Sequence, residues 1–504
     1  MARAVRLRCV PLTEVGPADL QTLSGAPSSS TTIPRVRRLL TGWGRTSPSA
    51  ADVVSVRRPE QIDALIAEAA RSARPLVPRG LGRSYGDAAQ CAGGLVVDTT
   101  GLNHVLDSDL ESGSIRVGAG ASLHSLMCAL VPRGWFVPVT PGTRFVTIGG
   151  AIAADIHGKN HHHDGSFMQH VTRLSIAAPV GRIEASPSTR ASPDDGAGAN
   201  ADLFWATAGG MGLTGIVVEA TIRLLPVETA WMNVDTERCR DLDDCMSKME
   251  SGDSGYRYSV AWIDCLARGR HMGRAVLTRG DHARLDDLPP RLRHAASASR
   301  FEPTSRFEVP FIPPGRLLNP VTVAAFNEMW FRKAPLLQTG HPEHMTTFFH
   351  PLDGIGAWNR LYGRLGFIQY QLVVPTGSAG EGVLRRVLER LGETRTASFL
   401  AVLKRFGPGD PAPLSFPMEG WTLALDLANG PAGLGEMLDD LDVMVAEAGG
   451  RVYLAKDSRL RPEMLSTMYP RLDEFQAVRR KVDPAGILVS DMARRLGLLG
   501  MEET

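Results

Sequence analysis

Two glycine-rich segments, residues 78–88 (PRGLGRSYGDA) and 141–150 (PGTRFVTIGG), constrain the fold of this 504-residue chain more than any other feature. Each follows an apolar stretch with strand character, so we expect both loops to lie between strands. Glycine leaves backbone N–H groups open to an approaching anion, and such a loop can form an anion-binding nest. Two nests can clamp the two phosphates of a dinucleotide, although either loop alone is equally explained as a tight turn.

Three better-known glycine motifs partly match the first segment or the residues that follow the second. Segment 80–86 (GLGRSYG) has glycine spacing one residue longer than the Rossmann fingerprint, and no helix signal follows it. It also fits the nucleophile elbow G-x-S-x-G at Ser84, but the elbow too requires a following helix, which leaves a hydrolase as the weakest alternative. Segment 157–160 (HGKN) ends like a phosphate loop, but Asn160 stands where a Walker motif has Ser or Thr.

Composition excludes several function classes. Lys and Arg number 55 against 54 Asp and Glu, so bulk electrostatic binding to nucleic acid is not expected. No apolar run reaches the roughly 18–20 residues that span a bilayer. We therefore expect a cytoplasmic protein or one peripheral to the cell membrane, with the periplasmic, cell-envelope face left open. The six cysteines form no C-x-x-C pair and do not indicate a structural zinc site.

Four histidines crowd into the segment 155–165 (DIHGKNHHHDG). A metal needs ligands that converge on one point, and the adjacent side chains of 161–163 cannot all point one way on a regular element. We therefore predict no metal here, and expect 161–163 to serve surface or loop packing.

The order of the motifs carries a family resemblance. The chain contains, in sequence, PRGLGRSYGD, GGLVVDTTGLNHV, IRVGAGASLHSLMCAL, PGTRFVTIGGAIAADIHGKNHH and GGMGLTGIVVEATI. Together they resemble the PCMH-type FAD-binding domain of the vanillyl-alcohol-oxidase-like flavoproteins. Further segments include TGWGRT, AWID, FFHPLDGIGAWNRLYG, GFIQYQ, KRFGPGDPAPLSFPMEGW, YLAKDSR and VRRKVDPAGILVSDMARRL. Across residues 41–498 the chain thereby resembles the family of decaprenylphosphoryl-β-D-ribose 2′-oxidases.

The resemblance implies an α+β flavoprotein of two domains. It places the PCMH-type FAD-binding domain at 41–225 and an antiparallel-sheet substrate domain at 226–440. Residues 441–504 are then a C-terminal segment that returns to the FAD-binding domain. Residues 1–40 lie outside the resemblance, and we expect a disordered N-terminal extension there. The segment 284–318, rich in Pro, Arg and Ser, is expected to be a mobile loop of the substrate domain.

The resemblance also implies the cofactor site. Covalent members of the superfamily attach the flavin to a histidine in the first loop, and Arg83 stands at that place, so FAD is expected to be held non-covalently. The residues implied in FAD binding are Arg79, Gly80, Leu81, Gly82, Arg83, Ser84, Tyr85, Gly86, Asp87, Gly142, Thr147, Ile148, Gly149, Gly150, Asp155, Ile156, His157, Ile216 and Tyr453.

The implied reaction is oxidation of the 2′-hydroxyl of decaprenylphosphoryl-β-D-ribofuranose to the 2′-ketone, with hydride passing to flavin N5. It is the first half of an epimerisation that makes the arabinose donor for cell-wall arabinan, and the resemblance implies a short-chain reductase as the partner for the second half. Lys456, His157 and Tyr85 are the implied catalytic residues. The implied substrate pocket comprises Lys404, Gln369, Gln371, Trp262, Phe349 and Ala424. Lys404 is expected to pair with the lipid phosphate.

Two positions depart from the family pattern. Ala424 stands where some members carry a pocket cysteine, and Phe349 where a tyrosine is common. Hydride transfer does not need that thiol, so we expect the redox chemistry to be kept. Covalent inhibitors that react with the thiol should not act on this chain. Two alternatives stay open: an alditol or sugar-lactone oxidase of the same fold, and a non-catalytic flavin-binding subunit.

Overall fold

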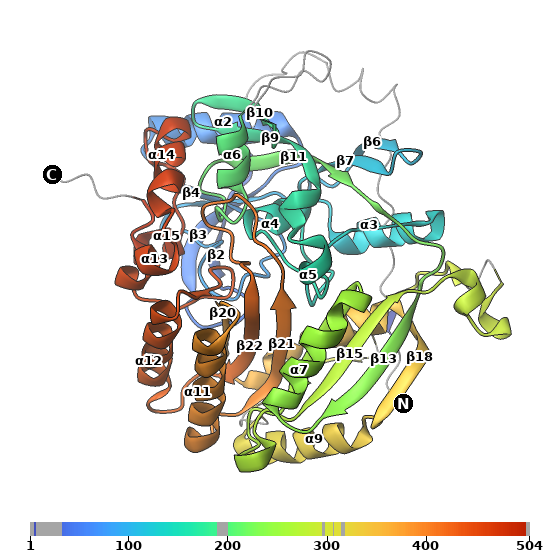
Figure 1. The fold of residues 1–504 in the computed structure, drawn as a ribbon. Coiled ribbons are helices and arrows are strands. Elements are labelled where there is room, and N and C mark those ends of the chain that lie inside the picture. Colours follow the sequence, from blue (N-terminus) through green and yellow to red (C-terminus); the bar gives the residue numbers. More distant parts are fainter. Residues whose placement is uncertain are drawn as a thin grey trace.

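The computed structural model of the chain describes residues 5–6, 33–188, 200–294, 298–305, 307–313 and 318–499. Figure 1 shows a half built from the first part of the chain above a larger half dominated by one long sheet. This is the two-domain α+β arrangement that the family resemblance implies. No helix among these residues has both the length and the apolar character to cross a membrane.

The upper half contains two sheets. A four-stranded sheet has the order β2-β3-β5-β4, with β3 and β4 parallel to β5. A five-stranded antiparallel sheet has the order β10-β9-β11-β7-β6. The strands are β2 Val36–Leu40, β3 Ser49–Ser55, β4 Leu76–Arg79, β5 Leu95–Asp98, β6 Val105–Asp109, β7 Ser114–Gly118, β9 Val171–Ala178, β10 Gly181–Ala185 and β11 Ile216–Arg223. The helices are α2 Pro59–Arg71, α3 Leu123–Leu130, α4 Ile148–Ala153, α5 His161–Asp164 and α6 Ala201–Thr207.

The lower half is one eight-stranded sheet of order β18-β13-β15-β14-β21-β22-β20-β23, antiparallel throughout. Its strands are β13 Trp231–Cys239, β14 Tyr258–Ile263, β15 Ala275–His282, β18 Leu337–His344, β20 Phe367–Val374, β21 Ser398–Phe406, β22 Gly420–Ala428 and β23 Arg451–Val452. Its helices are α7 Leu242–Gly252, α9 Pro320–Lys333, α10 Met345–Phe349, α11 Ser378–Thr394 and α12 Leu434–Glu447. Two-residue strands β1 Val5–Arg6, β8 Trp135–Phe136, β12 Leu225–Pro226, β16 Thr304–Ser305, β17 Phe307–Glu308 and β19 Ile355–Gly356 make small separate pairings.

One face of the long sheet packs against helices, and the other faces the functional site. Side chains alternate between faces along a strand, so Tyr370 and Leu372 of β20 face opposite to Gln369 and Gln371. The first face is apolar and is covered by α7, α11 and α12. In Figure 1, α7 lies in front of the strands, and α11 and α12 lie toward the left of the sheet. The second face, carrying the two glutamines, is left for the functional site.

The C-terminal segment consists of α13 Pro462–Met468, α14 Leu472–Val482 and α15 Asp491–Leu496. It is tied to the upper half by polar contacts. Ser49 Oγ donates to Asp491 Oδ2 at 2.6 Å, and Arg495 forms ion pairs with both Asp87 and Asp457 at 2.8 Å.

Three expectations from the sequence differ from the structure. Order starts before residue 41, because β2 pairs with β3 and β1 pairs with β16; the rest of 1–32 lies outside the described residues. The boundary at 440 cuts through α12, whose buried apolar side covers the sheet. The second glycine loop does not lead into a strand, because Thr147 caps α4 by accepting from Gly150 N. In 284–318, the described part holds short 3-10 turns and the two-residue strands β16 and β17, and its mobility stays a prediction.

Candidate active site

A cavity of about 440 Å³ lies between the two halves of the molecule. Both glycine loops reach it from above, and the free face of the long sheet closes it from below. The segment after β23 completes the wall. The predicted site residues that line it are Gly80, Leu81, Gly82, Arg83, Ser84, Tyr85, Gly142, Thr147, Gly149, Gly150, Ile156, His157, Ile216, Trp262, Phe349, Gln369, Gln371, Lys404, Ala424, Tyr453 and Lys456.

Five predicted cofactor residues lie behind this wall instead. Arg79 donates to the carbonyls of residues 41 and 89, and so fixes the base of the first loop. Gly86 packs against the backbone at residue 457, where a Cβ atom would clash. Asp87 pairs with the C-terminal helix, Ile148 is fully buried, and Asp155 accepts hydrogen bonds from Met168 N and Ser415 Oγ. These five shape the site without facing the cavity.

The first loop has the geometry of an anion nest. It runs from β4 to β5 with no helix between them, and Gly82 has a positive φ of +63°. Gly80 lies so close to Thr147 of the second loop that no Cβ atom fits between them. Among the described residues, the backbone N–H groups of Leu81, Gly82 and Arg83 have no protein acceptor. This is the open donor set expected for a bound pyrophosphate.

The same absence of a helix removes the hydrolase interpretation. Ser84 lines the cavity, but its loop continues to β5 without the strand–turn–helix that an elbow requires. Its carbonyl accepts from Trp43 N at 2.8 Å, and Arg83 stacks on the ring of Trp43 at 3.9 Å.

A charged network lies at the end of the cavity nearest β20. The Lys456 ammonium sits 3.9 Å above the ring of Tyr85. Gln369 Nε2 donates to the Tyr85 hydroxyl at 3.1 Å and to Asp426 Oδ1 at 2.5 Å. Burial lowers the pKa of Lys456 to about 7, with Asp426 opposing that shift. Burial also raises the pKa of Asp426 to about 7, against the hydrogen bond from Gln369 and the charge of Lys456.

A second network joins His157 to the sheet. Thr422 Oγ1 donates to the carbonyl of Leu372, so it accepts from Gln371 Nε2 at 3.2 Å. In this amide orientation Gln371 Nε2 also donates to His157 Nε2, at 2.9 Å. A neutral imidazole then carries its hydrogen on Nδ1, which lies 3.1 Å from Lys404 Nζ. That contact requires an uncharged Lys404 amine as acceptor.

The pKa shifts agree with this hydrogen-bond assignment. Burial lowers the pKa of Lys404 to about 7, helped by the positive charges of Lys456 and Lys159. Burial and the same kind of repulsion hold the pKa of His157 well below its ordinary value. Near neutral pH the pair therefore contains a neutral imidazole and a lysine that is readily deprotonated.

Lys159 is a site residue that sequence reasoning missed. It lines the cavity two residues after His157, donates to the carbonyl of Phe348 and lies 4.4 Å from that ring. Burial lowers its pKa to about 8. The signal was present in the HGKN segment, which was considered only as a failed Walker motif. Asp426 was also missed, because a carboxylate inside a strand pattern gives no functional signal.

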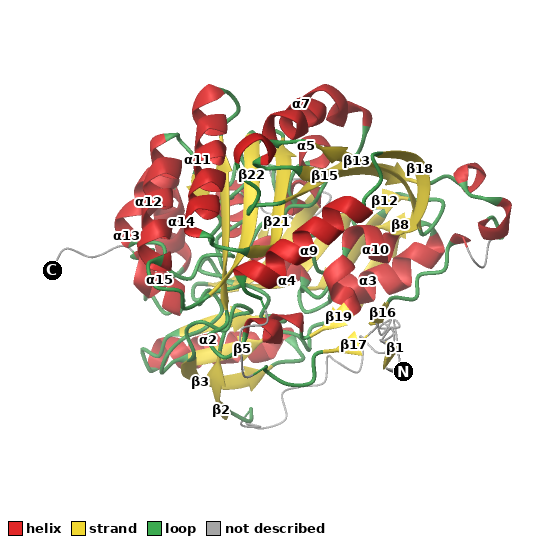
Figure 2. Cartoon of the chain, turned by 90° about the horizontal axis from the view of Figure 1, so that it is seen from below, coloured by secondary structure: helices red, strands yellow, loops and turns green. Residues whose placement is uncertain are grey.

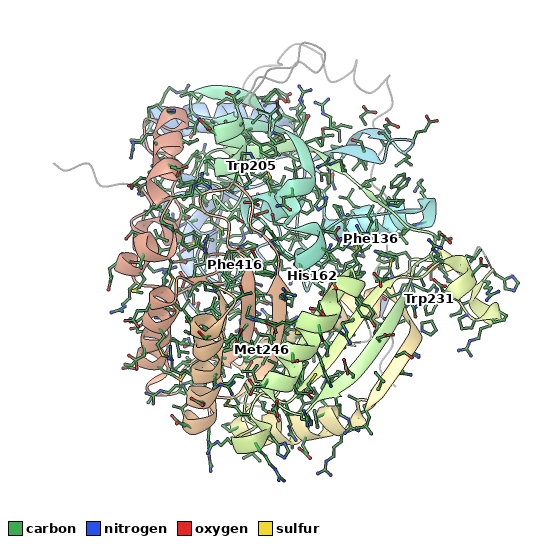
Figure 3. All side chains as sticks on the ribbon, viewed as in Figure 1. Phe136, His162, Trp205, Trp231, Met246 and Phe416 are labelled. Carbon is green, nitrogen blue, oxygen red and sulfur yellow. The ribbon has the colours of Figure 1, made fainter. Side chains whose placement is uncertain are left out.

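The side chains of the three adjacent histidines, 161–163, have different surroundings, as expected for neighbours in sequence. His161 is buried against the ring of Phe406 at 4.4 Å, so it packs in the core rather than on the surface. His162, labelled in Figure 3, contacts the carbonyl of Tyr256 at 2.9 Å. His163 is exposed beside Asp164. No group of three metal-ligating side chains occurs among the described residues.

The far end of the cavity is apolar. Trp262, Val276 and Leu400 line it from β14, β15 and β21, and Trp330 of α9 lines it from outside the sheet. The ring of Phe349 stacks on Phe136 at 5.2 Å, and Ala424 is the register partner of Gln371. The site thus has a polar end with cations and an apolar end toward α9.

Comparisons with known proteins agree with this geometry. A model of the FAD binding domain matches residues 50–186, and one of D-arabinono-1,4-lactone oxidase matches residues 427–496. Decaprenylphosphoryl-beta-D-ribose oxidase of Mycolicibacterium smegmatis is 45% identical over 473 residues, covering 94% of this chain and 100% of that protein. An uncharacterized Streptomyces coelicolor protein is 40% identical over 75% of this chain and 100% of its own length. Cytokinin dehydrogenase 10 of Oryza sativa is 29% identical over 46% of this chain and 43% of its own length.

Proposed function

The chain belongs to the family of the decaprenylphosphoryl-β-D-ribose oxidases, and from that membership we propose that it oxidises the 2′-hydroxyl of a polyprenylphosphoryl ribose to the 2′-ketone. It is an FAD-dependent oxidoreductase. When bound, FAD supplies the acceptor for the hydride. The observation that carries the substrate proposal is one cavity with lysines at its polar end and apolar side chains at its other end.

The cofactor fits the residues present. The open N–H groups of the first loop and the close approach of Gly80 to Thr147 suit the pyrophosphate. We propose that FAD is held non-covalently. The guanidinium of Arg83 is not a nucleophile, both ring nitrogens of His157 are in hydrogen bonds, and no described cysteine lines the cavity.

The catalytic residues follow from the two networks. Lys456, fixed over Tyr85, places a positive charge where the substrate oxygen becomes negative as it loses its proton. Lys404, with a pKa near 7, is matched to accept that proton at neutral pH, once its single lone pair turns from the Nδ1–H of His157 to the substrate hydroxyl. His157, with its pKa far lower, stays neutral and holds the resting amine in the cavity. The phosphate expected at Lys404 fits Lys159 better, because Lys159 keeps more of its charge at neutral pH.

The first experiment is the visible spectrum of the purified protein before and after acid precipitation. We expect yellow colour that moves to the supernatant. Colour retained in the pellet would refute non-covalent binding. Anaerobic addition of a polyprenylphosphoryl ribose should then bleach the flavin and yield a product lighter by one H₂. No bleaching with any polyol or phosphoryl sugar would instead support a non-catalytic subunit.

A second candidate function has one specific observation in its favour. The C-terminal match to D-arabinono-1,4-lactone oxidase suggests a soluble sugar-lactone or alditol oxidase. Bleaching by free lactone or alditol, with dioxygen as efficient acceptor, would support it over the lipid-linked substrate.

Two partners extend the main proposal. A ketone product must be reduced to complete an epimerisation, so we propose a short-chain reductase that receives it. We also propose peripheral membrane contact involving the loop 284–318, because the substrate lipid resides in a bilayer. Loss of membrane co-sedimentation after deletion of the loop is the expected result, and unchanged sedimentation would refute it.

A further inference from the structure

Large apolar side chains are exposed on α9 and directly after it. The exposed fractions are 78% for Val321, 56% for Met329, 41% for Trp330, 75% for Leu336 and 64% for Leu337. Val321 and Trp330 are nine residues apart and lie on opposite sides of the helix, with Met329 between these two directions, so the five residues form a band around α9 and its C-terminal end, which we call the α9 patch. Such side chains seldom gather on the surface of a soluble protein unless the surface binds something.

The helix beneath the patch is firmly anchored. Asn327, on the side of the helix away from Met329, is buried and donates to Asp264 Oδ1 at 2.7 Å. Phe326 packs against Phe399 of β21 with ring centroids 4.7 Å apart. Seen from below, α9 lies at the front of the molecule, across the strands (Figure 2). The exposed side of α9 is therefore a fixed outer surface of the domain.

Cations adjoin the patch. Arg332 and Lys333, in the last turn of α9, are both exposed. Arg332 forms an ion pair with Glu328 at 2.5 Å, so Lys333 is the cation of these two that forms no ion pair among the described residues. An apolar patch bordered by positive charge matches the interface of a membrane that contains anionic lipids, where apolar side chains enter the acyl region and cations meet the head groups.

The patch is continuous with the active-site cavity through Trp330. This residue belongs to both surfaces, since it lines the cavity while remaining partly exposed. Inside, the wall continues through Trp262 and Leu400 toward the lysines. A substrate with a phosphate at the lysines can thus extend its hydrocarbon along an apolar wall that ends at the α9 patch.

We propose that the α9 patch docks on an anionic lipid bilayer and admits the substrate's hydrocarbon chain directly from the membrane into the cavity. This inference rests on the proposed function, because only a lipid-linked substrate needs such an entrance. It assigns a docking surface on the described helix α9, beside the loop 284–318.

The test compares two triple variants of the full-length flavoprotein. The first is Val321→Gln, Met329→Gln and Leu336→Gln, which leaves Trp330 intact. The matched control is Leu39→Gln, Val180→Gln and Val443→Gln, three exposed apolar residues elsewhere on the surface. Binding is measured by co-sedimentation with vesicles of phosphatidylcholine mixed with phosphatidylglycerol. Oxidation of a short-chain, water-soluble polyprenylphosphoryl ribose is measured in parallel by flavin bleaching.

We expect the α9 variant to bind vesicles at least about tenfold more weakly than the unmodified protein, while the control variant binds normally. Oxidation of the soluble substrate should be unchanged in both. Equal sedimentation of the two variants would overturn the docking proposal, and so would an α9 variant that changes a dimer to a monomer without affecting vesicle binding. If the α9 variant loses its flavin, vesicle binding is measured again with the double variant Leu336→Gln and Leu337→Gln, whose residues follow the helix. A soluble substrate that bleaches no variant, the unmodified protein included, refutes the proposed function instead, whatever the vesicles show.

Discussion

Replacing Asp426 with asparagine should move the pH dependence of flavin reduction, because this carboxylate supports the charge on Lys456. The substitution keeps the size of the side chain and leaves Gln369 an oxygen to which it can donate. It removes a negative charge that raises the pKa of Lys456. The cation that stabilises the forming alkoxide is then lost at a lower pH.

The expected shift can be estimated from the geometry. Tyr85 and Gln369 link the two charged groups. At an effective dielectric constant of about 20, unit charges separated by about 5–10 Å interact by about 2–3 kcal/mol, which is on the order of 1–2 pKa units. Lys456 has a lowered pKa of about 7. The cation is present below this value and is lost as the pH rises through it. In Asp426→Asn the loss begins at lower pH, and reduction at pH 8 should slow by about tenfold or more.

The assay is anaerobic stopped-flow reduction of the flavin by substrate from pH 5.5 to 9. The matched control is Asp442→Asn, which removes a carboxylate with a similarly raised pKa of about 7 on α12, outside the cavity. That variant should lose stability, since Asp442 pairs with Arg459 at 2.8 Å, but its pH profile should stay in place. An unshifted profile in Asp426→Asn, or an equal shift in both variants, would refute the role assigned to Asp426.

Three further outcomes are expected. Lys404→Met should lower kcat by about 100-fold or more at neutral pH, whereas Lys159→Met should mainly raise KM; the reverse pattern in steady-state kinetics would exchange the two roles. Ala424→Cys should place a thiol in the cavity that a thiol reagent modifies, detected by mass spectrometry and blocked by substrate, while the unmodified protein shows no label at this position. Arg495→Ala breaks the ion pair that joins the C-terminal helix to Asp87. It should cost about 2–3 kcal/mol of unfolding free energy and weaken flavin retention, followed by thermal unfolding and by flavin release on heating. An unchanged Tm would contradict this.

The sequence could specify the cavity wall because the wall is built from local patterns. The first glycine loop has no helix signal after it, and the structure has none there. Gln369 and Gln371 are two residues apart in a strand, so their sharing a face followed from the strand period. The distant members, Lys404 and Lys456, came from the family resemblance, since no local pattern brings β21 and the segment after β23 together.

Other features were beyond local patterns. Asp426 sits in an apolar strand, and only the packing of β22 beside β20 puts it next to Gln369. Trp330 reads as an ordinary residue of an amphipathic helix, because its place in the cavity wall depends on how α9 lies across the sheet. The capping of α4 by Thr147 was missed because its glycines suggested a loop, although a Thr accepting from a backbone N–H three residues on is a common helix start.

The three lysines of the cavity make the protein's stability depend on its ligands. Lys159, Lys404 and Lys456 all have lowered pKa values, of about 8, 7 and 7. In the unfolded chain each would keep a pKa near 10.4, so between pH 8 and 10 the unfolded state binds more protons and stability rises with pH. The rise is at most about 1.4 kcal/mol per pH unit for each lysine.

Bound anions weaken this dependence. The substrate phosphate, proposed to bind at Lys159, favours the charged lysines and returns their pKa values toward normal. We therefore expect the Tm of cofactor-free protein to rise from pH 8 to 9.5, and that of the FAD- and substrate-loaded protein to rise much less over the same range. Calorimetry in buffers of different ionisation enthalpy should show proton uptake on substrate binding near pH 8. Proton release, or parallel Tm curves with and without ligands, would mean that the lysines do not face the phosphate.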